Sequence, residues 1–307
     1  MEYKKLGLTD LKISRIGFGC WAIGGYGWGK VNDRDSIATI RKALDLGINF
    51  FDTADVYGFG YSEEILSKAL GNQKKKVVIA TKFGVKWDKS GRTDKDISSK
   101  RVVEALDGSL KRLKIDCIPL YQIHWPDFKT PISETMEALK KCQKAGKIKH
   151  IGCCNFSVDL IQEAQKISRI EALQAPYNIK EREIERELIH CCRKYKISII
   201  TYSTLLQGLF TGKYGRKSKF SKNDVRSRYE NWVGEKFDKN LKIVEKLKKL
   251  SAFYKKTPAQ IAIRWVLDNT NIASALVGVQ KPEQIQENVD ATGWKLSKED
   301  RENLAKL

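Results

Sequence analysis

The chain has 307 residues, of which 41% are hydrophobic and 31% are charged, so it holds enough apolar material for a large core. No run approaches the roughly 18 consecutive apolar residues that a membrane-spanning helix needs, and the N-terminus lacks the apolar segment of a secretory signal. We therefore expect a cytoplasmic globular protein without a membrane partner.

The chain is strongly basic, with 57 Lys and Arg against 37 Asp and Glu, a formal net charge of +20. Half of this excess lies between residues 210 and 256, where 15 basic residues face 5 acidic ones. This segment has no helix-turn-helix, zinc-finger or RNA-binding signature. We therefore expect no nucleic-acid partner. The segment is expected to be a flexible, solvated, lysine-rich surface, and the alternative is a local field that attracts phosphate-bearing cofactors.

Seven cysteines are present, with two adjacent pairs at 153–154 and 191–192. They form no CxxC pair and show no metal-ligand spacing, so we expect no metal site. Cysteine behaves as a small hydrophobe when it is reduced. The seven are therefore expected to be reduced and buried.

Short apolar runs alternate along the chain with amphipathic segments. The short runs are rich in β-branched and aromatic residues, as buried parallel strands are. They predict strands at residues 16–19, 49–52, 77–82, 120–124, 150–154, 172–174, 197–202 and 274–277. The amphipathic segments predict helices at 33–46, 62–69, 98–113, 132–144, 158–167, 182–195, 258–268 and 282–289.

Eight strand–helix repeats without a Gly/Pro/Ser-rich linker predict an α/β fold in which residues 1–307 form a single (β/α)8 TIM barrel. Three segments lie outside the repeat. Residues 3–6 and 11–14 predict an N-terminal β-hairpin, residues 213–254 an insertion after the seventh strand, and residues 297–307 an extra C-terminal helix.

Polar side chains stand at the ends of three successive predicted strands. Asp52 ends the second, Lys82 the third and His124 the fourth, and Tyr57 lies in the loop after Asp52. Taken singly, such an acid is more often a cap, such a Tyr packing, and such a His part of the core. Barrel enzymes, however, place their active sites where the carboxyl ends of the strands meet. The four together predict a catalytic site.

The motifs around these residues resemble those of the aldo-keto reductase family. They are FDTADVYG at 51–58 with SE at 62–63, TKFG at 81–84, QIHWPD at 122–127, GKIKHIG at 146–152 and NFS at 155–157. The likeness extends from residue 6 to about residue 294, nearly the whole chain. It implies a bacterial-type member with a short C-terminus that reduces aldehydes or ketones with NAD(P)H.

The resemblance implies a role for each of the four residues. Tyr57 would be the general acid, because a phenol with a pKa of about 10 holds its proton at neutral pH. Lys82 would lower that pKa and stabilise the phenolate, and Asp52 would orient Lys82. Neutral His124 would donate a hydrogen bond to the substrate oxygen.

The resemblance also implies a cofactor site spread along the chain. Near the nicotinamide we expect Gly19, Cys20, Trp21, Asp52, Asn155, Gln174 and Tyr202. Along the pyrophosphate we expect Ser203, Leu205, Gln207, Gly208 and Leu209, with Lys213 and Arg226 closing over it. At the adenosine end we expect Gly278, Val279, Gln280, Lys281, Gln284, Glu287 and Asn288.

Two departures from the family pattern affect the cofactor. Cys20 stands where the family often has Thr, so only a backbone contact is implied there. Gln280 stands where many relatives carry a basic residue against the 2′-phosphate of NADP. Lys281 or Arg226 would have to replace that charge, so NADP(H) is favoured and NAD(H) is the alternative.

The substrate is a small carbonyl compound that the motifs do not specify further. Trp21, Trp28 and Trp125 are the expected walls of an aromatic pocket, and for Trp28 a purely packing role is an equal reading. The chain ends soon after its last predicted helix, which favours an open pocket. We expect a monomer or a weak homo-oligomer.

Three other interpretations differ in fold or in chemistry. Residues 17–22 fit the GxGxxA fingerprint of an open Rossmann sheet, but glycines 24, 25 and 27 disfavour the helix that must follow. An aldolase barrel would need a neutral Lys82, which the neighbouring Asp52 disfavours. The remaining alternative is a cofactor-binding regulatory or redox-sensing subunit on the same fold with little turnover.

Overall fold

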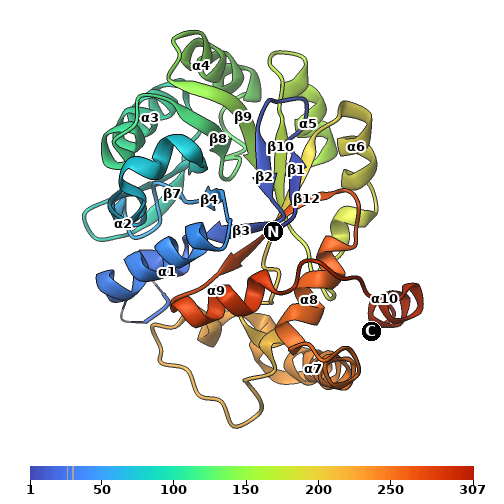
Figure 1. Cartoon of the computed structure of the whole chain (residues 1–307). Coiled ribbons are helices and arrows are strands. Elements are labelled where there is room, and N and C mark those ends of the chain that lie inside the picture. The colour runs from blue at the N-terminus through green and yellow to red at the C-terminus, as the bar shows by residue number, and fades with distance from the viewer. Residues whose placement is uncertain (26, 30) are drawn as a thin grey trace.

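Eight parallel strands close into a barrel, which confirms the predicted fold (Figure 1). The computed structural model describes residues 1–25, 27–29 and 31–307. Each strand pairs with the next around the barrel, and β9 pairs with β10 to close it. The barrel strands are β3 (Ile16–Gly19), β4 (Phe50–Asp52), β5 (Val78–Phe83), β8 (Ile118–Ile123), β9 (Ile148–Cys154), β10 (Ala172–Pro176), β11 (Ser198–Tyr202) and β12 (Ile272–Gly278).

Helices surround the barrel as an outer ring (Figure 1). The ring consists of α1 (Asp33–Asp45), α2 (Tyr61–Leu70), α3 (Ser99–Leu113), α4 (Ile132–Lys144), α5 (Val158–Gln165), α6 (Leu188–Tyr195), α8 (Pro258–Leu267) and α9 (Pro282–Val289). Two helices lie outside the repeat, α7 (Gly234–Tyr254) and α10 (Lys298–Ala305). Short 3-10 turns occur at Ala22–Gly24, Gly71–Lys76, Glu183–Glu185, Leu209–Thr211, Val225–Arg228 and Glu230–Trp232.

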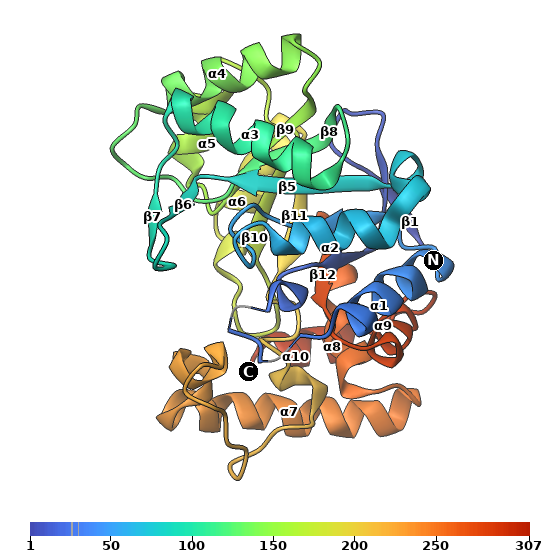
Figure 2. The ribbon, with the colours of Figure 1, turned by 90° about the vertical axis from the view of Figure 1, so that its left-hand side faces the viewer.

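Two small antiparallel hairpins lie at opposite ends of the barrel (Figure 2). The expected N-terminal hairpin pairs β1 (Tyr3–Lys5) with β2 (Lys12–Ser14). The second, which the sequence did not predict, pairs β6 (Val85–Trp87) with β7 (Thr93–Lys95) directly after β5. Because it follows the carboxyl end of a barrel strand, it stands at the end where barrel enzymes carry their active sites.

Local side chains fix the helix starts that the sequence predicted. Asn32 caps α1 by accepting a hydrogen bond from the backbone N–H of Arg34 at 2.8 Å. Thr257 and Gln260 form a capping box at the start of α8, with Pro258 in the first turn. Such caps satisfy N–H groups that the helix itself leaves unpaired.

Two predicted segments differ from the structure. Residues 182–195 form a 3-10 turn followed by the short helix α6. Side-chain contacts hold the start of this segment out of the helix, because Arg182 donates to the backbone oxygen of Ala305 and Glu185 accepts from Tyr177.

The lysine-rich insertion is not a loop throughout, because its second half is the 21-residue helix α7. That helix buries Ile243, Val244, Leu247 and Leu250, so its lysines cover a packed apolar stripe.

The barrel interior is filled from the end that carries the N-terminal hairpin. Leu6 and Ile13 of the hairpin segment pack with inward residues of the strands, such as Phe50, Ala80 and Leu120. Since side chains alternate along a strand, the residues two positions further on also face inward, towards the other end.

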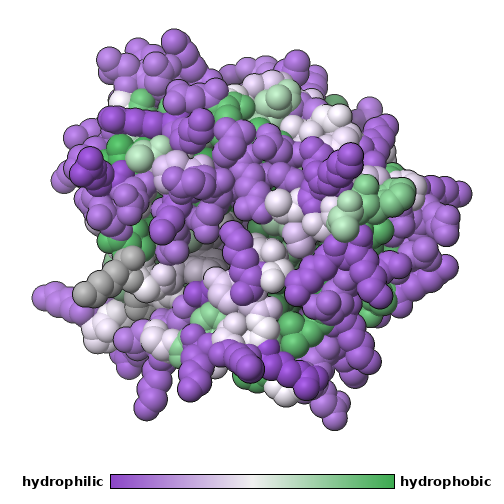
Figure 3. Space-filling view, turned by 60° about the horizontal axis from the view of Figure 1, so that its bottom comes forward, coloured by the Kyte–Doolittle hydropathy of each residue, from purple (hydrophilic) through white to green (hydrophobic). Residues whose placement is uncertain are grey.

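On the face drawn in Figure 3 the surface is predominantly hydrophilic, with separate small apolar patches. Among the described residues, no helix combines the length and apolarity that crossing a membrane requires. All seven cysteines are unpaired, and six of them are buried. Cys117 is exposed, so the prediction that every cysteine is buried was wrong for that residue.

Candidate active site

Strand alternation brings the predicted catalytic residues into the barrel mouth. Asp52 ends β4 two residues after the inward Phe50, and Lys82 lies on β5 two residues after the inward Ala80. His124 follows β8 directly, and its backbone N–H donates to the oxygen of Phe83 at 2.8 Å. The side chains therefore converge because of the pleat of three neighbouring strands.

A buried chain of hydrogen bonds links three of these residues. The Lys82 Nζ lies 2.5 Å from Asp52 Oδ1, and neither side chain is more than 3% exposed. The same ammonium donates to the backbone oxygen of Thr53 at 2.9 Å and to Tyr57 Oη at 3.3 Å. All three donors of Lys82 are thus used, and the phenol is held beside a positive charge.

The surroundings set the protonation state of each group. Burial raises the pKa of Tyr57 to about 12, although the positive charge of Lys82 opposes the rise. Burial by itself would lower the pKa of Lys82, but the negative Asp52 outweighs it and raises that pKa above its ordinary value. Burial, aided by Lys82, lowers the pKa of His124 well below its ordinary value. At neutral pH the site therefore holds a phenol, an ammonium and a neutral imidazole.

Aromatic rings lie near the ring of Tyr57. The His124 ring meets the Tyr57 ring edge-on, with centroids 5.7 Å apart, and Trp125 stacks beside His124 at 6.4 Å. Trp21 lies 6.4 Å from Tyr57, and Trp28 packs edge-on against Trp21 at 5.1 Å. Of the three tryptophans expected to form a pocket, Trp21 and Trp28 therefore lie on the Tyr57 side and Trp125 beside His124.

Trp28 also connects this wall to other loops. Its backbone oxygen accepts a hydrogen bond from the Gln280 side chain at 3.0 Å. The Arg226 guanidinium lies 5.7 Å from its ring centroid. Segments that follow β3, β11 and β12 thus meet at Trp28.

The residues expected near a nicotinamide lie on the next strands around the barrel. Asn155 follows β9 in a left-handed conformation, with φ of 60°. Its amide donates to the His124 backbone oxygen at 3.1 Å and accepts from the Tyr202 hydroxyl at 2.8 Å. Gln174 donates to Asp52 Oδ2 at 2.8 Å.

The end of β3 supplies the remaining residues expected near the nicotinamide. Gly19 ends β3 and pairs with Gly278 of β12. Cys20 is fully buried, and its backbone N–H donates to the backbone oxygen of Asp52 at 2.8 Å. Its side chain packs in the hydrophobic core.

The loop after β11 has an unusual backbone. Ser203, Leu206 and Gln207 have positive φ angles of 60°, 48° and 52°, followed by Gly208 at 92°. Left-handed non-glycine residues are uncommon and gather at functional sites. The Gln207 side chain donates to Ser203 Oγ at 2.6 Å, while its amide oxygen Oε1 is buried without a partner among the described residues. Around this turn Leu205 is partly buried and Leu209 fully buried.

The segment after β12 forms the start of α9. The Gln284 side chain accepts from the backbone N–H groups of Gln280 and Lys281, at 2.8 and 3.1 Å. Val279 and Asn288 are buried, whereas Lys281 is exposed.

Two cations of the insertion are engaged by protein groups. Lys213 lies 3.8 Å from Glu287 of α9, which ties the insertion to that helix. Arg226 forms a two-point ion pair with Asp224, at 2.6 and 2.8 Å, and donates to the Tyr214 hydroxyl at 2.8 Å.

Two residues at the site were given no role from the sequence. Gln122 of β8 donates to Asp52 Oδ2 at 3.1 Å. Cys154, the last residue of β9, is buried, and burial raises the pKa of its thiol. Gln122 stands in an otherwise apolar strand, two residues before His124. This position could have indicated from the sequence that its side chain belongs to the site.

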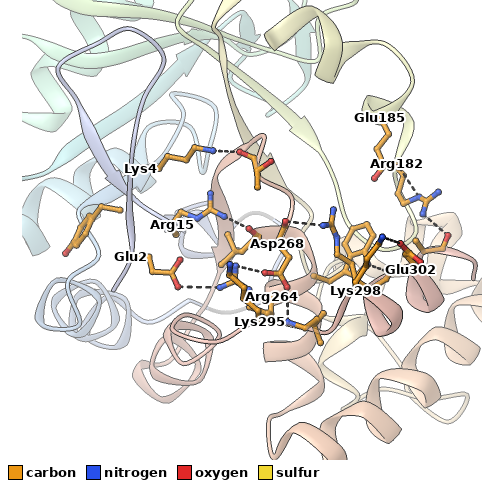
Figure 4. A pocket seen from close by; sticks show the side chains of 17 residues that line it. Glu2, Lys4, Arg15, Arg182, Glu185, Arg264, Asp268, Lys295, Lys298 and Glu302 are labelled. Carbon is orange, nitrogen blue, oxygen red and sulfur yellow. Dashed lines mark hydrogen bonds and ion pairs between the residues drawn. The ribbon is translucent and has the colours of Figure 1, made fainter.

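A groove outside this site lies beside the N-terminal hairpin and α8 (Figure 4). It has a volume of about 830 Å³, and seven basic and four acidic side chains line it. Its inner cations are engaged by the protein, since Arg15 donates to the backbone oxygens of Leu267 and Ile272 and Arg264 pairs with Asp268 at 3.0 Å. None of the four predicted catalytic residues lines it.

The closed (β/α)8 barrel places the protein among the TIM-barrel proteins. A family model described as "Aldo/keto reductase family" matches residues 15–307. The chain belongs to this family of oxidoreductases, whose members use nicotinamide cofactors.

Three similar proteins illustrate the relation. The chain is 40% identical over 307 residues to the aldo-keto reductase YhdN of Bacillus subtilis (strain 168), covering 99% of this chain and 92% of that protein. It is 37% identical over 315 residues to the NADH-specific methylglyoxal reductase of Escherichia coli (strain K12), covering 98% and 96%. The solved structure of glycerol dehydrogenase AKR11B4 from Gluconobacter oxydans superposes with a TM-score of 0.92 at 37% identity, covering 99% and 94%.

Proposed function

We propose that this protein reduces aldehydes and ketones to alcohols with NAD(P)H, and that Tyr57 is the general acid. The observation that carries the proposal is the buried Asp52–Lys82–Tyr57 chain at the barrel mouth, beside a neutral His124. We expect it to act in the cytoplasm on a small carbonyl compound, as a monomer or a weak homo-oligomer.

The residues present fit a nicotinamide dinucleotide. Asn155 and Gln174 offer amide groups matched to a carboxamide, and the Tyr202 hydroxyl holds Asn155 in place. The left-handed turn at residues 206–208 and the orphaned carbonyl oxygen of Gln207 are features that a bound polar group would account for. The reduced nicotinamide, when bound, supplies the hydride.

The protein's own residues handle the charge that develops on the carbonyl oxygen. The neutral His124 donates a hydrogen bond to that oxygen, and Tyr57 transfers its proton to it. Lys82 stabilises the resulting phenolate, and Asp52 keeps Lys82 protonated and fixed. Burial strengthens each of these interactions, because little water screens them.

For the cofactor we propose NADP(H), with Lys281 as the residue that meets the 2′-phosphate. Gln280 carries no charge, and its amide is used by Trp28. Arg226 is held by Asp224 and Tyr214, whereas Lys281 is exposed beside the expected adenosine end. The Escherichia coli relative is named as NADH-specific, so membership of the family does not decide the cofactor.

The test is single-turnover oxidation of bound NADPH, and separately of bound NADH, by a reactive aldehyde. We expect rapid loss of the reduced-nicotinamide absorbance with stoichiometric alcohol. Tight cofactor binding with no oxidation across a panel of aldehydes and ketones would favour the regulatory subunit instead.

A further inference from the structure

The Asp52 carboxylate is held by more groups than Lys82 alone. Its Oδ1 meets the Lys82 ammonium at 2.5 Å. Its Oδ2 accepts two amide hydrogen bonds, from Gln174 at 2.8 Å and from Gln122 at 3.1 Å. Hydrogen bonds from both sides fix the plane of a carboxylate and stabilise its charged form.

The two amides have different prospects when a cofactor binds. Gln174 is proposed above to bind the nicotinamide carboxamide, so its amide would be shared between Asp52 and the cofactor. Gln122 is fully buried on β8, opposite Lys82 of β5 in the strand register. Its amide nitrogen donates to Asp52, and its amide oxygen has no partner among the described residues.

The neighbouring strand leaves space for this side chain. Gly152 of β9 is the register partner of Gln122 on the other side. A Cβ at position 152 would lie 3.0 Å from Gln122 Cγ and 3.2 Å from the Ala172 oxygen. Even an alanine there would crowd the glutamine.

A glutamine at position 122 costs stability if its only role is to fill the core. Its carbonyl oxygen is buried and has no hydrogen-bond partner among the described residues. An unpaired buried polar atom is destabilising, and a methionine of similar volume would avoid it. The amide N–H₂ that reaches Asp52 is the group with a use.

We propose that Gln122 is a positioning residue that holds the Asp52 carboxylate, and through it the Lys82 ammonium, in the orientation that serves Tyr57. The inference rests on the proposed function. It adds that the alignment of Asp52 and Lys82 depends on a further inward side chain, from β8, the strand that His124 follows.

The test compares Gln122→Met, which keeps the volume and removes the donor, with Gln122→Glu, which can donate only when protonated. Aldehyde reduction is measured from pH 5 to pH 9, with kcat and both KM values. We expect kcat of Gln122→Met to fall about tenfold at every pH, the loss of one hydrogen bond to a charged group, with the cofactor KM within about twofold of wild type. Gln122→Glu should approach the wild-type kcat at acid pH and lose it as its carboxyl ionises beside Asp52.

Two further variants separate the possible failures. Gln174→Met should raise the cofactor KM as well as lower kcat, because it contributes to both sites. Tyr57→Phe reports on the proposed function itself. If Tyr57→Phe is inactive while a folded Gln122→Met keeps kcat within twofold of wild type, or Gln122→Glu shows no loss at high pH, the positioning role is overturned. If Tyr57→Phe also turns over normally, the proposed function has failed with it.

Discussion

At the scale of single residues, the charge on Lys82 decides which chemistry the site can support. A Schiff base requires a neutral amine, and such lysines sit in apolar pockets or beside other cations. Lys82 instead donates to Asp52, Thr53 and Tyr57, and its pKa is raised because Asp52 outweighs the effect of burial. The ammonium is therefore a fixed positive charge rather than a nucleophile.

This predicts that Lys82 stays unmodified under trapping conditions. Borohydride is added with a reactive aldehyde and no nicotinamide cofactor, and the protein is analysed by peptide mass spectrometry. We expect no adduct at Lys82, while surface lysines report the background. A stoichiometric mass increase at Lys82 would support the aldolase reading.

At the scale of elements, the loop between β4 and α2 positions Tyr57 by close packing against the loop after β3. Gly58 has a φ of +60°, and a Cβ there would lie 2.2 Å from the Gly24 oxygen. No side chain fits in that space without moving the loop. Tyr57 precedes this glycine directly, so a displacement of Gly58 reaches the phenol.

Gly58→Ala should therefore lower kcat for aldehyde reduction by about 100-fold, since a shift near 1 Å can cost that much. Gly146→Ala is the matched control, because Gly146 also has a positive φ, of +74°, but an added Cβ would meet nothing within 4 Å. Both variants should lose a little stability from backbone strain. Equal kcat values for the two variants would contradict the packing argument.

The loops that follow β11 and β12 predict how the cofactor is chosen. A charge-assisted contact to phosphate is worth about 1.5–3 kcal/mol, so Lys281→Ala should weaken NADPH binding by at least about tenfold. NADH binding should change little, because NADH lacks the 2′-phosphate. Arg226→Ala is the control, since its guanidinium is already paired with Asp224. Isothermal titration of both cofactors decides between the two residues, and equal losses for NADH and NADPH at Lys281 would exclude its role.

The barrel itself was predictable because its eight strands are short apolar runs that alternate regularly with amphipathic helices. The insertion was not, because the lysines of α7 hide the stripe of Ile243, Val244 and Leu247 in a composition that reads as solvated surface. The pairing of Arg226 with Asp224 was also missed, because a spacing of two residues does not by itself predict that the two side chains form an ion pair. Gln122 begins the motif at residues 122–127, but its contact with Asp52 depends on how the barrel strands pair.

At the scale of the whole molecule, two further ion pairs with buried carboxylates join the loop between β4 and α2, and α2 itself, to α3. Asp55 is fully buried and pairs with Arg101 of α3, and Glu63 of α2 pairs with Arg112 at 2.6 Å. Burial raises the pKa of Asp55 to about 7, with Arg101 opposing the rise. Because this value is above that of the unfolded chain, Asp55 contributes stability that is fully present below about pH 4 and is lost as the pH rises through about 7.

Asp55→Asn removes this titration. Each unit of pKa difference corresponds to about 1.4 kcal/mol, so between pH 5 and pH 8 wild type should lose on the order of 2 kcal/mol relative to the variant. Urea unfolding of both proteins at the two pH values measures the difference, and contributions from all other groups cancel in the comparison. A gap that does not change with pH, or one that favours wild type at pH 8, would show that Arg101 holds the ionised carboxylate.

The central claim, that Tyr57 gives up the proton in carbonyl reduction, is tested most directly by single-turnover oxidation of bound NADPH in wild type and Tyr57→Phe. Both proteins are saturated with cofactor and mixed with the same aldehyde, so product release does not enter the rate. General acid catalysis is typically worth about 10²–10⁴-fold, and the Phe variant should be slower by that factor while its NADPH affinity is nearly unchanged. A Phe variant that oxidises NADPH at the wild-type rate would contradict the account.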